Sequence, residues 1–224
     1  SLIKRSVTIA KKARDDFWKV PYNRENRPFP LIAGSVGPYG AYLADGSEYR
    51  GYSNINEENL INFHRPRMKI LVEENVDILA CETLPSLIEA KAIVKLLREF
   101  PGVYCWISFS CKNGLEISDE TPISDCAKLL DGCEQVAAIG VNCTAPQYVQ
   151  SLIEEIKKNS NKPVVVYPNS GEEYDVNSKT WRGDSSCESY SCNAKIWFDK
   201  GASLIGGCCR TTPQDIKAIA KWAR

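Results

Sequence analysis

The order of apolar and amphipathic segments constrains the fold of this chain most strongly. Short, mostly apolar runs alternate with longer amphipathic stretches. This alternation is typical of βαβ units, in which parallel strands form a sheet and helices cover it. Runs that are apolar throughout indicate strands that are buried on both faces. The six predicted strands are residues 30–36, 77–81, 103–110, 136–141, 163–167 and 203–205.

An amphipathic stretch follows each predicted strand, and one more, at residues 2–18, precedes the first of them. The polar candidates for chemistry come just after strands, at the end where (β/α)8 barrels carry their sites. We therefore interpret the chain as an α/β barrel. The six helices predicted after the strands are residues 57–74, 86–99, 123–130, 146–158, 187–200 and 213–222.

The strand count departs from a complete barrel. A (β/α)8 barrel needs eight strands and typically about 250 residues, whereas this chain has six candidates in 224 residues. It also begins without methionine, inside a helical stretch. We expect a (β/α)8 TIM barrel lacking its first two strands, with residues 1–224 forming a single partial barrel domain. Because an open barrel exposes strand edges, we expect this polypeptide alone to be poorly stable and weakly active or inactive.

Composition excludes several classes of function. The 28 basic and 28 acidic residues cancel, so we expect no nucleic-acid partner. No apolar stretch reaches the roughly 20 residues of a membrane span, and no signal peptide is visible at the start. We therefore expect a cytoplasmic protein that does not bind membranes. The ten cysteines do not fit a disulfide scaffold, which is usually short, and indicate reduced thiols with a subset that binds metal.

Three cysteines follow predicted strands. Cys143 ends the motif Ile-Gly-Val-Asn-Cys, and Cys208 and Cys209 come side by side after two glycines. Three thiolates can hold a zinc ion and leave its fourth position open, as catalytic zinc sites do. The alternative is that these are buried structural thiols, which are common. The other cysteines show no ligand-like grouping and are predicted to be structural: Cys81, Cys105, Cys111, Cys126, Cys133, Cys187 and Cys192.

Such a zinc site has a definite chemical preference. A substrate thiol in the open position would lose its proton to become a thiolate. Four thiolates on one Zn²⁺ carry a formal charge of about minus two, which favours a cationic electrophile such as a methyl sulfonium. Methyl transfer then releases a neutral thioether and needs no general acid. His64 is the single histidine of the chain, and we expect it to have a surface or packing role.

Five motifs carry a resemblance that covers essentially the whole chain: AGSVGPYGAYL at residues 33–43, CET at 81–83, GVNC at 140–143, VYPNSG at 166–171 and GGCCRTTP at 206–213. On these motifs the chain resembles the homocysteine S-methyltransferases, zinc enzymes that make methionine, and most of all the plant type that uses S-methylmethionine. The resemblance implies a (β/α)8 barrel with Cys143, Cys208 and Cys209 as zinc ligands. It also implies that Glu82 binds the amino group of homocysteine.

One family feature is not found in this chain. The first strand of the family ends in an Asp-Gly-Gly motif that also contacts homocysteine, so Glu82 is the recognisable amine ligand that remains. An acid at the end of a barrel strand points toward the barrel mouth, although a salt bridge or a helix cap would also explain Glu82. Tyr39, Tyr42, Tyr49 and Tyr52 either cover the site and contact a sulfonium through cation–π attraction or simply pack their loop.

The resemblance and the charge argument lead to one expectation. Zinc activates homocysteine, and S-methylmethionine, or secondarily S-adenosylmethionine, donates the methyl group to give methionine. Selenocysteine is an alternative acceptor, because a selenolate is an even softer zinc ligand. Two rival interpretations stay open: a truncated, catalytically inactive zinc-binding chain, and an unrelated barrel with structural cysteines. The sequence does not define the oligomeric state.

Overall fold

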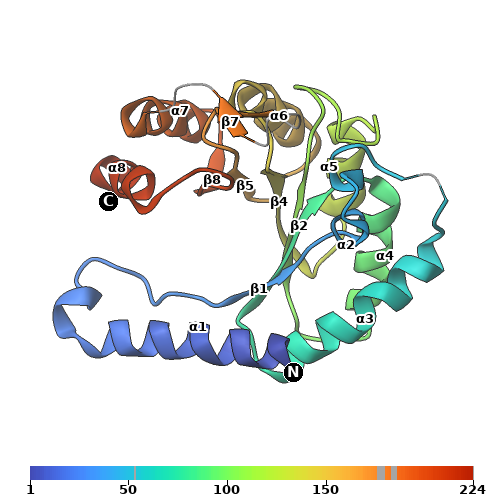
Figure 1. Cartoon of the computed structure of the whole chain (residues 1–224), viewed down its shortest axis with the longest axis horizontal. Helices are drawn as coiled ribbons and strands as arrows, with labels where there is room; N and C mark the ends of the chain where they lie inside the picture. Colours follow the sequence, from blue (N-terminus) through green and yellow to red (C-terminus); the bar gives the residue numbers. More distant parts are fainter. Residues whose placement is uncertain (53, 176–179, 183–185, 224) are drawn as a thin grey trace.

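A computed structural model describes residues 1–52, 54–175, 180–182 and 186–223. Six parallel strands form one sheet in the order β1-β2-β3-β4-β5-β8, which confirms the predicted α/β class and strand count (Figure 1). Each strand is followed by a helix on the outside of the sheet, as a βαβ chain requires. The strands are β1 (Ala33–Val36), β2 (Ile78–Leu84), β3 (Cys105–Phe109), β4 (Val136–Asn142), β5 (Val164–Tyr167) and β8 (Ala202–Ile205).

The main helices match the amphipathic stretches of the sequence. They are α1 (Leu2–Lys19), α3 (Glu57–Glu73), α4 (Leu87–Leu97), α5 (Ile123–Asp131), α6 (Pro146–Asn159), α7 (Cys187–Asp199) and α8 (Pro213–Ala223). The sequence did not predict several short elements, because each is too short to show a hydrophobic period. These are η1 (Pro21–Arg24), α2 (Tyr39–Leu43), η2 (Ser47–Tyr49) and the antiparallel pair β6 (Glu173–Asp175) and β7 (Thr180–Arg182).

Two strands extend further than the apolar pattern predicts. β2 continues past Cys81 to Leu84, which pairs with Phe109 after a shift of register. Glu82 therefore lies within β2, close to the carboxyl end of the strand, rather than after it. β4 likewise includes Asn142. Polar side chains at these positions are compatible with strand pairing because both lie at the carboxyl end of the sheet, where each has polar partners: Glu82 accepts from Ser35, and Asn142 bonds Thr83.

The hydrophobic core lies between the sheet and the helices that cover it. Leu60 and Met68 of α3, Ile93 of α4 and Leu152 of α6 are all completely buried. Burial of a side chain of this size stabilises the folded state by roughly 1.5–3 kcal/mol relative to exposure. The core thus fixes the strands and, with them, the loops at their carboxyl ends.

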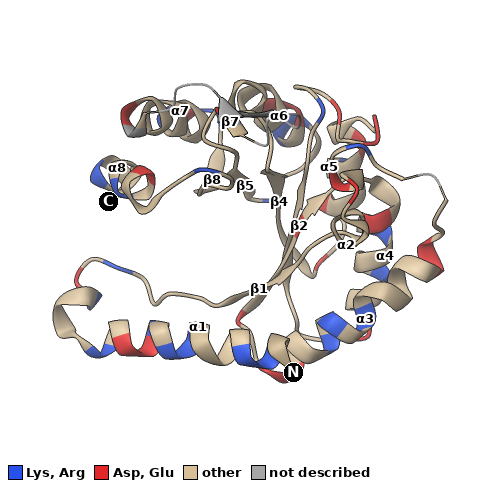
Figure 2. Cartoon of the chain, in the orientation of Figure 1, with Lys and Arg blue, Asp and Glu red and all other residues tan. Residues whose placement is uncertain are grey.

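Helix α1 is attached to this body by charged contacts. Basic and acidic side chains are interspersed along it (Figure 2). Lys4 pairs with Glu74 at 3.0 Å, and Arg14 pairs with Asp77 at 3.0 Å. Asp77 also accepts a hydrogen bond of 2.6 Å from the backbone N–H of Ile32. Because partly exposed ion pairs contribute at most about 1 kcal/mol each, these contacts orient α1 more than they stabilise it.

The sheet has two open edges. Within the described residues, β1 pairs only with β2, and β8 pairs only with β5. The side chain of Leu204 on β8 is 46% exposed. Six strands in this order correspond to an open barrel, as predicted. No helix in the part of the chain that the structure describes is long and apolar enough to cross a membrane.

Candidate metal centre and acceptor site

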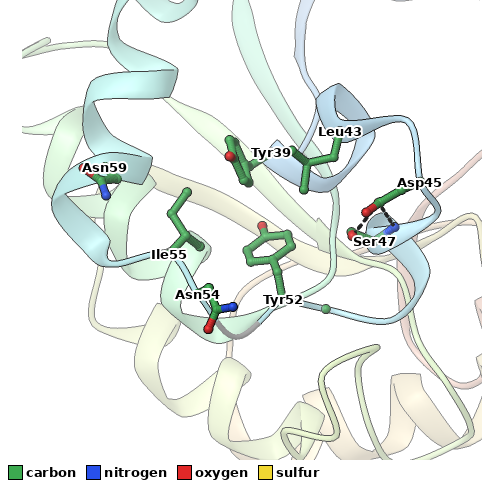
Figure 3. A pocket seen from close by; sticks show the side chains of 9 residues that line it. Tyr39, Leu43, Asp45, Ser47, Tyr52, Asn54, Ile55 and Asn59 are labelled. Atoms are coloured by element: carbon green, nitrogen blue, oxygen red, sulfur yellow. Dashed lines mark hydrogen bonds between the residues drawn. The ribbon is translucent and has the colours of Figure 1, made fainter.

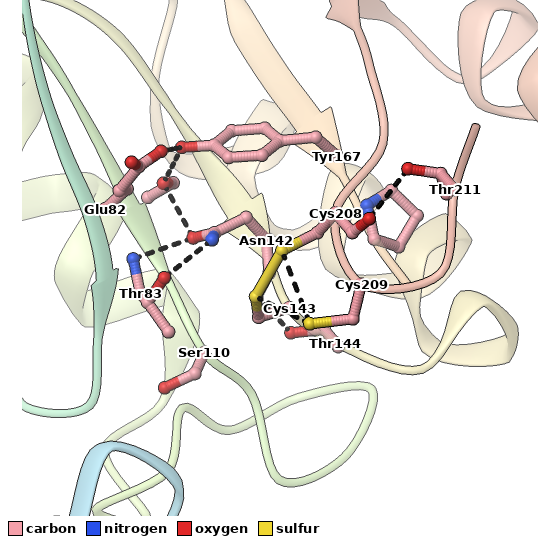
Figure 4. The surroundings of a disulfide bond; sticks show 12 residues. Glu82, Thr83, Ser110, Asn142, Cys143, Thr144, Tyr167, Cys208, Cys209 and Thr211 are labelled. Carbon is pink, nitrogen blue, oxygen red and sulfur yellow. Dashed lines mark hydrogen bonds between the residues drawn. A yellow bond between two sulfur atoms is a disulfide. The ribbon is translucent and has the colours of Figure 1, made fainter. Parts of the chain in front are cut away.

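The three cysteines predicted as ligands lie together at the carboxyl end of the sheet. Cys143 directly follows β4, and Cys208 and Cys209 follow β8 after two glycines (Figure 4). Their Sγ atoms all lie within 4.8 Å of one another, and each side chain is half-buried. Cys209 Sγ is 4.0 Å from both Cys143 Sγ and Cys208 Sγ. The fold therefore brings together residues that are 65 positions apart.

The last residue of β5 and the loop that follows hold the two cysteine segments against each other. The N–H of Cys208 donates to the carbonyl of Pro168 at 2.9 Å, and the N–H of Cys143 donates to the carbonyl of Tyr167 at 3.3 Å. Ser170 N–H donates in turn to the carbonyl of Cys209 at 3.1 Å. These backbone bonds hold the cysteines in place independently of the side chains.

The glycine before the cysteine pair is required by close packing. A Cβ atom at Gly207 would lie 2.3 Å from Thr211 Oγ1 and 2.6 Å from Thr211 Cβ. Thr211 cannot move away easily, because its hydroxyl donates to the carbonyl of Cys208 at 2.7 Å. Any larger residue at position 207 would displace the turn that carries Cys208 and Cys209.

The oxidation state differs from the expected set of free thiols. Cys143 and Cys208 are joined by a disulfide bond, and Cys209 is free (Figure 4). The physical reason is the close approach of the three sulfur atoms, which permits a bond between two of them. The remaining cysteines whose side chains are described are free, and Cys81 lies against Cys105. The side chain of Cys187 lies outside the described residues.

The donor set suits a soft metal ion once that disulfide is reduced. Cysteine sulfurs bound to zinc at about 2.3 Å in a tetrahedron are separated by roughly 3.8 Å. The 4.0 Å separations from Cys209 Sγ match this spacing closely. In the disulfide form, two of the three sulfurs carry no free thiolate and cannot bind metal in the same way.

Glu82 of β2 lies near this cluster and is held by hydroxyl groups. Its Oε1 accepts a hydrogen bond of 2.6 Å from Ser35 Oγ, and its Oε2 accepts one of 2.9 Å from the Tyr167 hydroxyl (Figure 4). Burial, followed by the charge of Glu82, raises the pKa of Tyr167 above its ordinary value, so the phenol stays protonated and can donate. These contacts replace the salt bridge or helix cap that the sequence left open for Glu82.

A polar network continues from Tyr167 to the residue before Cys143. Ser108 Oγ lies 2.5 Å from the Tyr167 hydroxyl and 2.8 Å from Asn142 Oδ1. Trp106 Nε1–H also donates to the Tyr167 hydroxyl, at 2.9 Å. Sequence reasoning missed this network. The available signal was the presence of polar residues, Asn142 above all, inside otherwise apolar strands.

A second buried cluster lies behind the loop that follows β1. His64 is fully buried, which settles its role as packing rather than surface, and its Nε2 lies 2.7 Å from Glu89 Oε1. Glu89 also accepts from the N–H of Tyr39 and from the Tyr52 hydroxyl. Burial raises the pKa of Glu89 to about 8 and lowers the pKa of His64 to about 3. Arg67 donates to His64 Nδ1 at 3.1 Å, so His64 Nε2–H donates to Glu89.

This second cluster explains two of the four loop tyrosines. Tyr39 and Tyr52 pack edge to face with their ring centres 5.7 Å apart and line a pocket of about 490 Å³ beside α2 (Figure 3). Neither Glu82 nor a cysteine lines that pocket. Tyr49 does not line that pocket, and burial, followed by the charge of Cys209, raises its pKa. Loop packing therefore accounts for Tyr39 and Tyr52.

The fold and the site together define a class: an α/β protein of the (β/α)-barrel type with three convergent cysteines able to hold a metal ion. A family model described as homocysteine S-methyltransferase matches residues 1–223. The chain therefore belongs to the homocysteine S-methyltransferase family of enzymes.

Individual relatives agree with this assignment. The chain is 63% identical over 223 residues to homocysteine S-methyltransferase YbgG of Bacillus subtilis, covering 100% of this chain and 71% of the relative. It is 46% identical over 222 residues to the Escherichia coli homocysteine S-methyltransferase, covering 98% of this chain and 70% of the relative. The solved structure of the metallated form of the E. coli homocysteine methyltransferase MmuM superposes with a TM-score of 0.85 at 41% identity. The match covers 98% of this chain and 69% of MmuM. Its oxidized form gives a TM-score of 0.84.

Proposed function

We propose that this chain binds zinc through Cys143, Cys208 and Cys209 and transfers a methyl group from S-methylmethionine, or secondarily from S-adenosylmethionine, to homocysteine. The observation that carries this proposal is the convergence of three Sγ atoms within 4.8 Å at the carboxyl end of the sheet. The family membership supports the acceptor. Residues 1–224 act in this proposal as a single, partial homocysteine-binding barrel domain.

The cysteines and the acid have separate tasks. Zinc, when bound, keeps the acceptor thiol in its nucleophilic thiolate form at neutral pH. Glu82 binds the ammonium group of the acceptor through its carboxylate, and this contact orients the acceptor with its sulfur toward the cysteine cluster. Ser35 and Tyr167 already hold Glu82, so little orientational freedom is lost when the amine binds.

The charge of the loaded site selects the donor. Three protein thiolates and one acceptor thiolate around a divalent ion leave an excess of negative charge. A methyl sulfonium is attracted to such a site and becomes a neutral thioether when its methyl carbon bonds to the acceptor sulfur. The leaving thioether takes no proton, so the reaction needs no acid in the site. His64, which is buried beside Glu89, takes no part.

Two alternatives have specific support. Selenocysteine as acceptor is supported by 43% identity over 235 residues to a selenocysteine Se-methyltransferase of Brassica oleracea. A catalytically inactive, zinc-binding chain is supported by the open edges of β1 and β8. In the second case the cysteines would still bind metal while turnover stays low.

The deciding experiment measures metal and turnover on the same reduced protein. The chain is treated with a phosphine reductant, loaded with zinc and analysed by mass spectrometry of the metal, then assayed with sulfonium and neutral methyl donors. We expect one zinc per chain and slow methyl transfer from sulfonium donors to homocysteine, because an open barrel should be weakly active. Zinc without turnover supports the inactive alternative. Absence of stoichiometric zinc, or equal rates with neutral donors, contradicts the proposal.

A further inference from the structure

The Tyr167 hydroxyl occupies a central position between the acid and the metal cluster. It lies 2.9 Å from Glu82 Oε2, 2.5 Å from Ser108 Oγ and 2.9 Å from Trp106 Nε1. Figure 4 shows its ring reaching across from β5 to Glu82 on β2. Tyr167 is the last residue of β5, and its carbonyl accepts from the N–H of Cys143. One residue therefore contacts the amine site with its side chain and the metal site with its backbone.

The donors and acceptors around the Tyr167 hydroxyl determine that it donates its proton to Glu82. Trp106 Nε1–H can only donate, so it fills one acceptor position of the Tyr167 oxygen. An ionised Glu82 can only accept, so the single proton of Tyr167 points at Glu82 Oε2. Ser108 Oγ, which donates its proton to Asn142 Oδ1 at 2.8 Å, lies 2.5 Å from the Tyr167 oxygen. The Tyr167 hydroxyl thus accepts from Trp106 and donates to Glu82 when Glu82 is a carboxylate, and these two bonds favour one orientation of the charged acid.

Ser35 completes the fixation of the carboxylate from the other side. Its hydroxyl donates to Glu82 Oε1 at 2.6 Å, whereas Tyr167 donates to Oε2. With each carboxylate oxygen held by one hydroxyl, rotation of the carboxylate about its terminal bond is blocked. Each oxygen keeps further acceptor capacity, which is available to an ammonium group.

We propose that Tyr167 is a positioning residue, which holds the Glu82 carboxylate in the orientation that receives the amino group of the acceptor. This proposal rests on the proposed function, because it assumes that Glu82 binds that amine. Tyr167 does not touch the acceptor; it acts through Glu82. Its removal should weaken the recognition of the amine and leave the binding of the thiol to the metal unchanged.

The test measures binding and does not depend on turnover. The reduced 224-residue chain is loaded with cobalt, and the thiolate-to-cobalt absorption is titrated with homocysteine and with 4-mercaptobutanoate, which has the same chain but no amine. The ratio of the two affinities reports amine recognition alone. A hydrogen bond to a charged group is worth about 1.5–3 kcal/mol, so we expect Tyr167→Phe to lower this ratio about tenfold or more. The affinity for 4-mercaptobutanoate should stay constant.

Three further variants separate the possible outcomes. Glu82→Gln should lower the ratio at least as much as Tyr167→Phe, and Ser35→Ala should lower it without altering Tyr167. Tyr148→Phe is the matched control, because Tyr148 packs against the core away from this network, and its ratio should equal that of the parent chain. The Ser35 variant keeps the test valid if Tyr167→Phe unfolds.

Each result tests two assignments, the amine-binding role of Glu82 and the positioning role of Tyr167. If Glu82→Gln lowers the ratio and Tyr167→Phe does not, the positioning role is wrong and the proposed function stands. If the parent chain binds both thiols equally, or if Glu82→Gln leaves the ratio unchanged, the amine assignment of Glu82 fails and the positioning role fails with it. A parallel loss of affinity for both thiols in Tyr167→Phe would indicate a purely structural role and also overturn the proposal.

Discussion

The side-chain amide of Asn142 binds Thr83 at two points: Asn142 Nδ2 donates to Thr83 Oγ1 at 2.7 Å, and Thr83 N–H donates to Asn142 Oδ1 at 2.8 Å. Thr83 directly follows Glu82, and Asn142 directly precedes Cys143. Both Thr83 and Cys143 have left-handed backbones, with φ of 61° and 47°, a conformation that costs of order 1–3 kcal/mol at a residue other than glycine. The Asn142–Thr83 pair therefore holds two strained strand ends at a fixed separation.

Replacement of Asn142 by alanine should loosen both strand ends. The change leaves the partly buried N–H of Thr83 without its acceptor, which costs about 1–3 kcal/mol. We expect the free energy of unfolding, measured by urea denaturation, to fall by about 2 kcal/mol, and the zinc affinity to fall as well. Asn161→Ala on the exposed surface is the control and should change stability by less than about 0.5 kcal/mol. Equal stability of the two variants would contradict this role of Asn142.

Replacement of Glu82 by glutamine should affect the acceptor and not the metal. The neutral amide cannot form an ion pair with an ammonium group, and hydrogen bonds to charged groups contribute about 1.5–3 kcal/mol. We expect homocysteine affinity, measured by calorimetry on the zinc-loaded chain, to fall about 10- to 100-fold at unchanged zinc content. Glu99→Gln, which removes only a surface pair with Arg65, serves as the control. Loss of zinc from the Glu82 variant would refute the assignment to amine binding.

Single cysteine replacements should identify the metal ligands. Cys209→Ser removes a sulfur that lies 4.0 Å from both of the others, and we expect zinc content to fall from one per chain to well below it. Cys143→Ser and Cys208→Ser should do the same. Cys192→Ser, at an exposed and free cysteine, should retain full zinc content. Retention of stoichiometric zinc by the Cys209 variant would exclude a three-cysteine site.

Oxidation and metal binding should compete for the same sulfurs. The Cys143–Cys208 disulfide uses two of the three proposed ligands, so we expect the oxidised chain to bind little zinc and the reduced chain to bind one equivalent. Titration of a zinc-loaded sample with a mild oxidant should release metal in step with the loss of two thiols, measured with a thiol reagent and a zinc dye. Zinc release without thiol loss would contradict the competition.

The Glu89–His64 pair should give stability a defined pH dependence. Glu89 has a folded pKa of about 8, above the unfolded value near 4.3, so its contribution to stability is lost as pH rises between them. His64, with a folded pKa of about 3 and an unfolded value near 6.5, has the opposite effect below pH 6.5. Above pH 6.5 only the Glu89 effect remains, and stability should fall toward pH 8 by at most about 1.4 kcal/mol per pH unit.

Glu89→Gln tests this assignment with little change of shape. Glutamine can still accept from Tyr39 N–H and donate to the Tyr52 hydroxyl, but it does not titrate. Urea denaturation at pH 6.5, 7.2 and 8.0 should show a decline in the parent chain and a flat profile in the variant. A decline of the same slope in both would assign the pH dependence to other groups.

Periodicity was sufficient to predict the fold but not the details of the site. Six apolar runs matched the six parallel strands because burial on both faces leaves a clear pattern. The site required contacts between strands far apart in sequence. The cysteines were found because adjacent thiols are rare enough to indicate a metal site, whereas Tyr167 and Asn142 looked like ordinary strand ends. Their partners, Glu82 and Thr83, lie 85 and 59 positions away, and no local pattern encodes such pairs.

The boundaries of β2 show why the sequence placed Glu82 after the strand rather than within it. The apolar run stops at Cys81, yet the strand continues to Leu84. Hydrogen bonding with β3, not hydrophobicity, decides where the strand ends. The disulfide between Cys143 and Cys208 could not be predicted for a related reason: the sequence defines which sulfurs meet but not their oxidation state.

In the described part of the chain, β1 and β8 each lack a second strand partner, and this has a consequence for the chain in solution. Each edge presents a row of backbone donors and acceptors, and β8 adds the exposed side chain of Leu204. Such edges are templates for strand addition by another polypeptide. The chain should therefore self-associate as its concentration increases. A short β-strand peptide that binds one edge should reduce this association and keep the chain in solution.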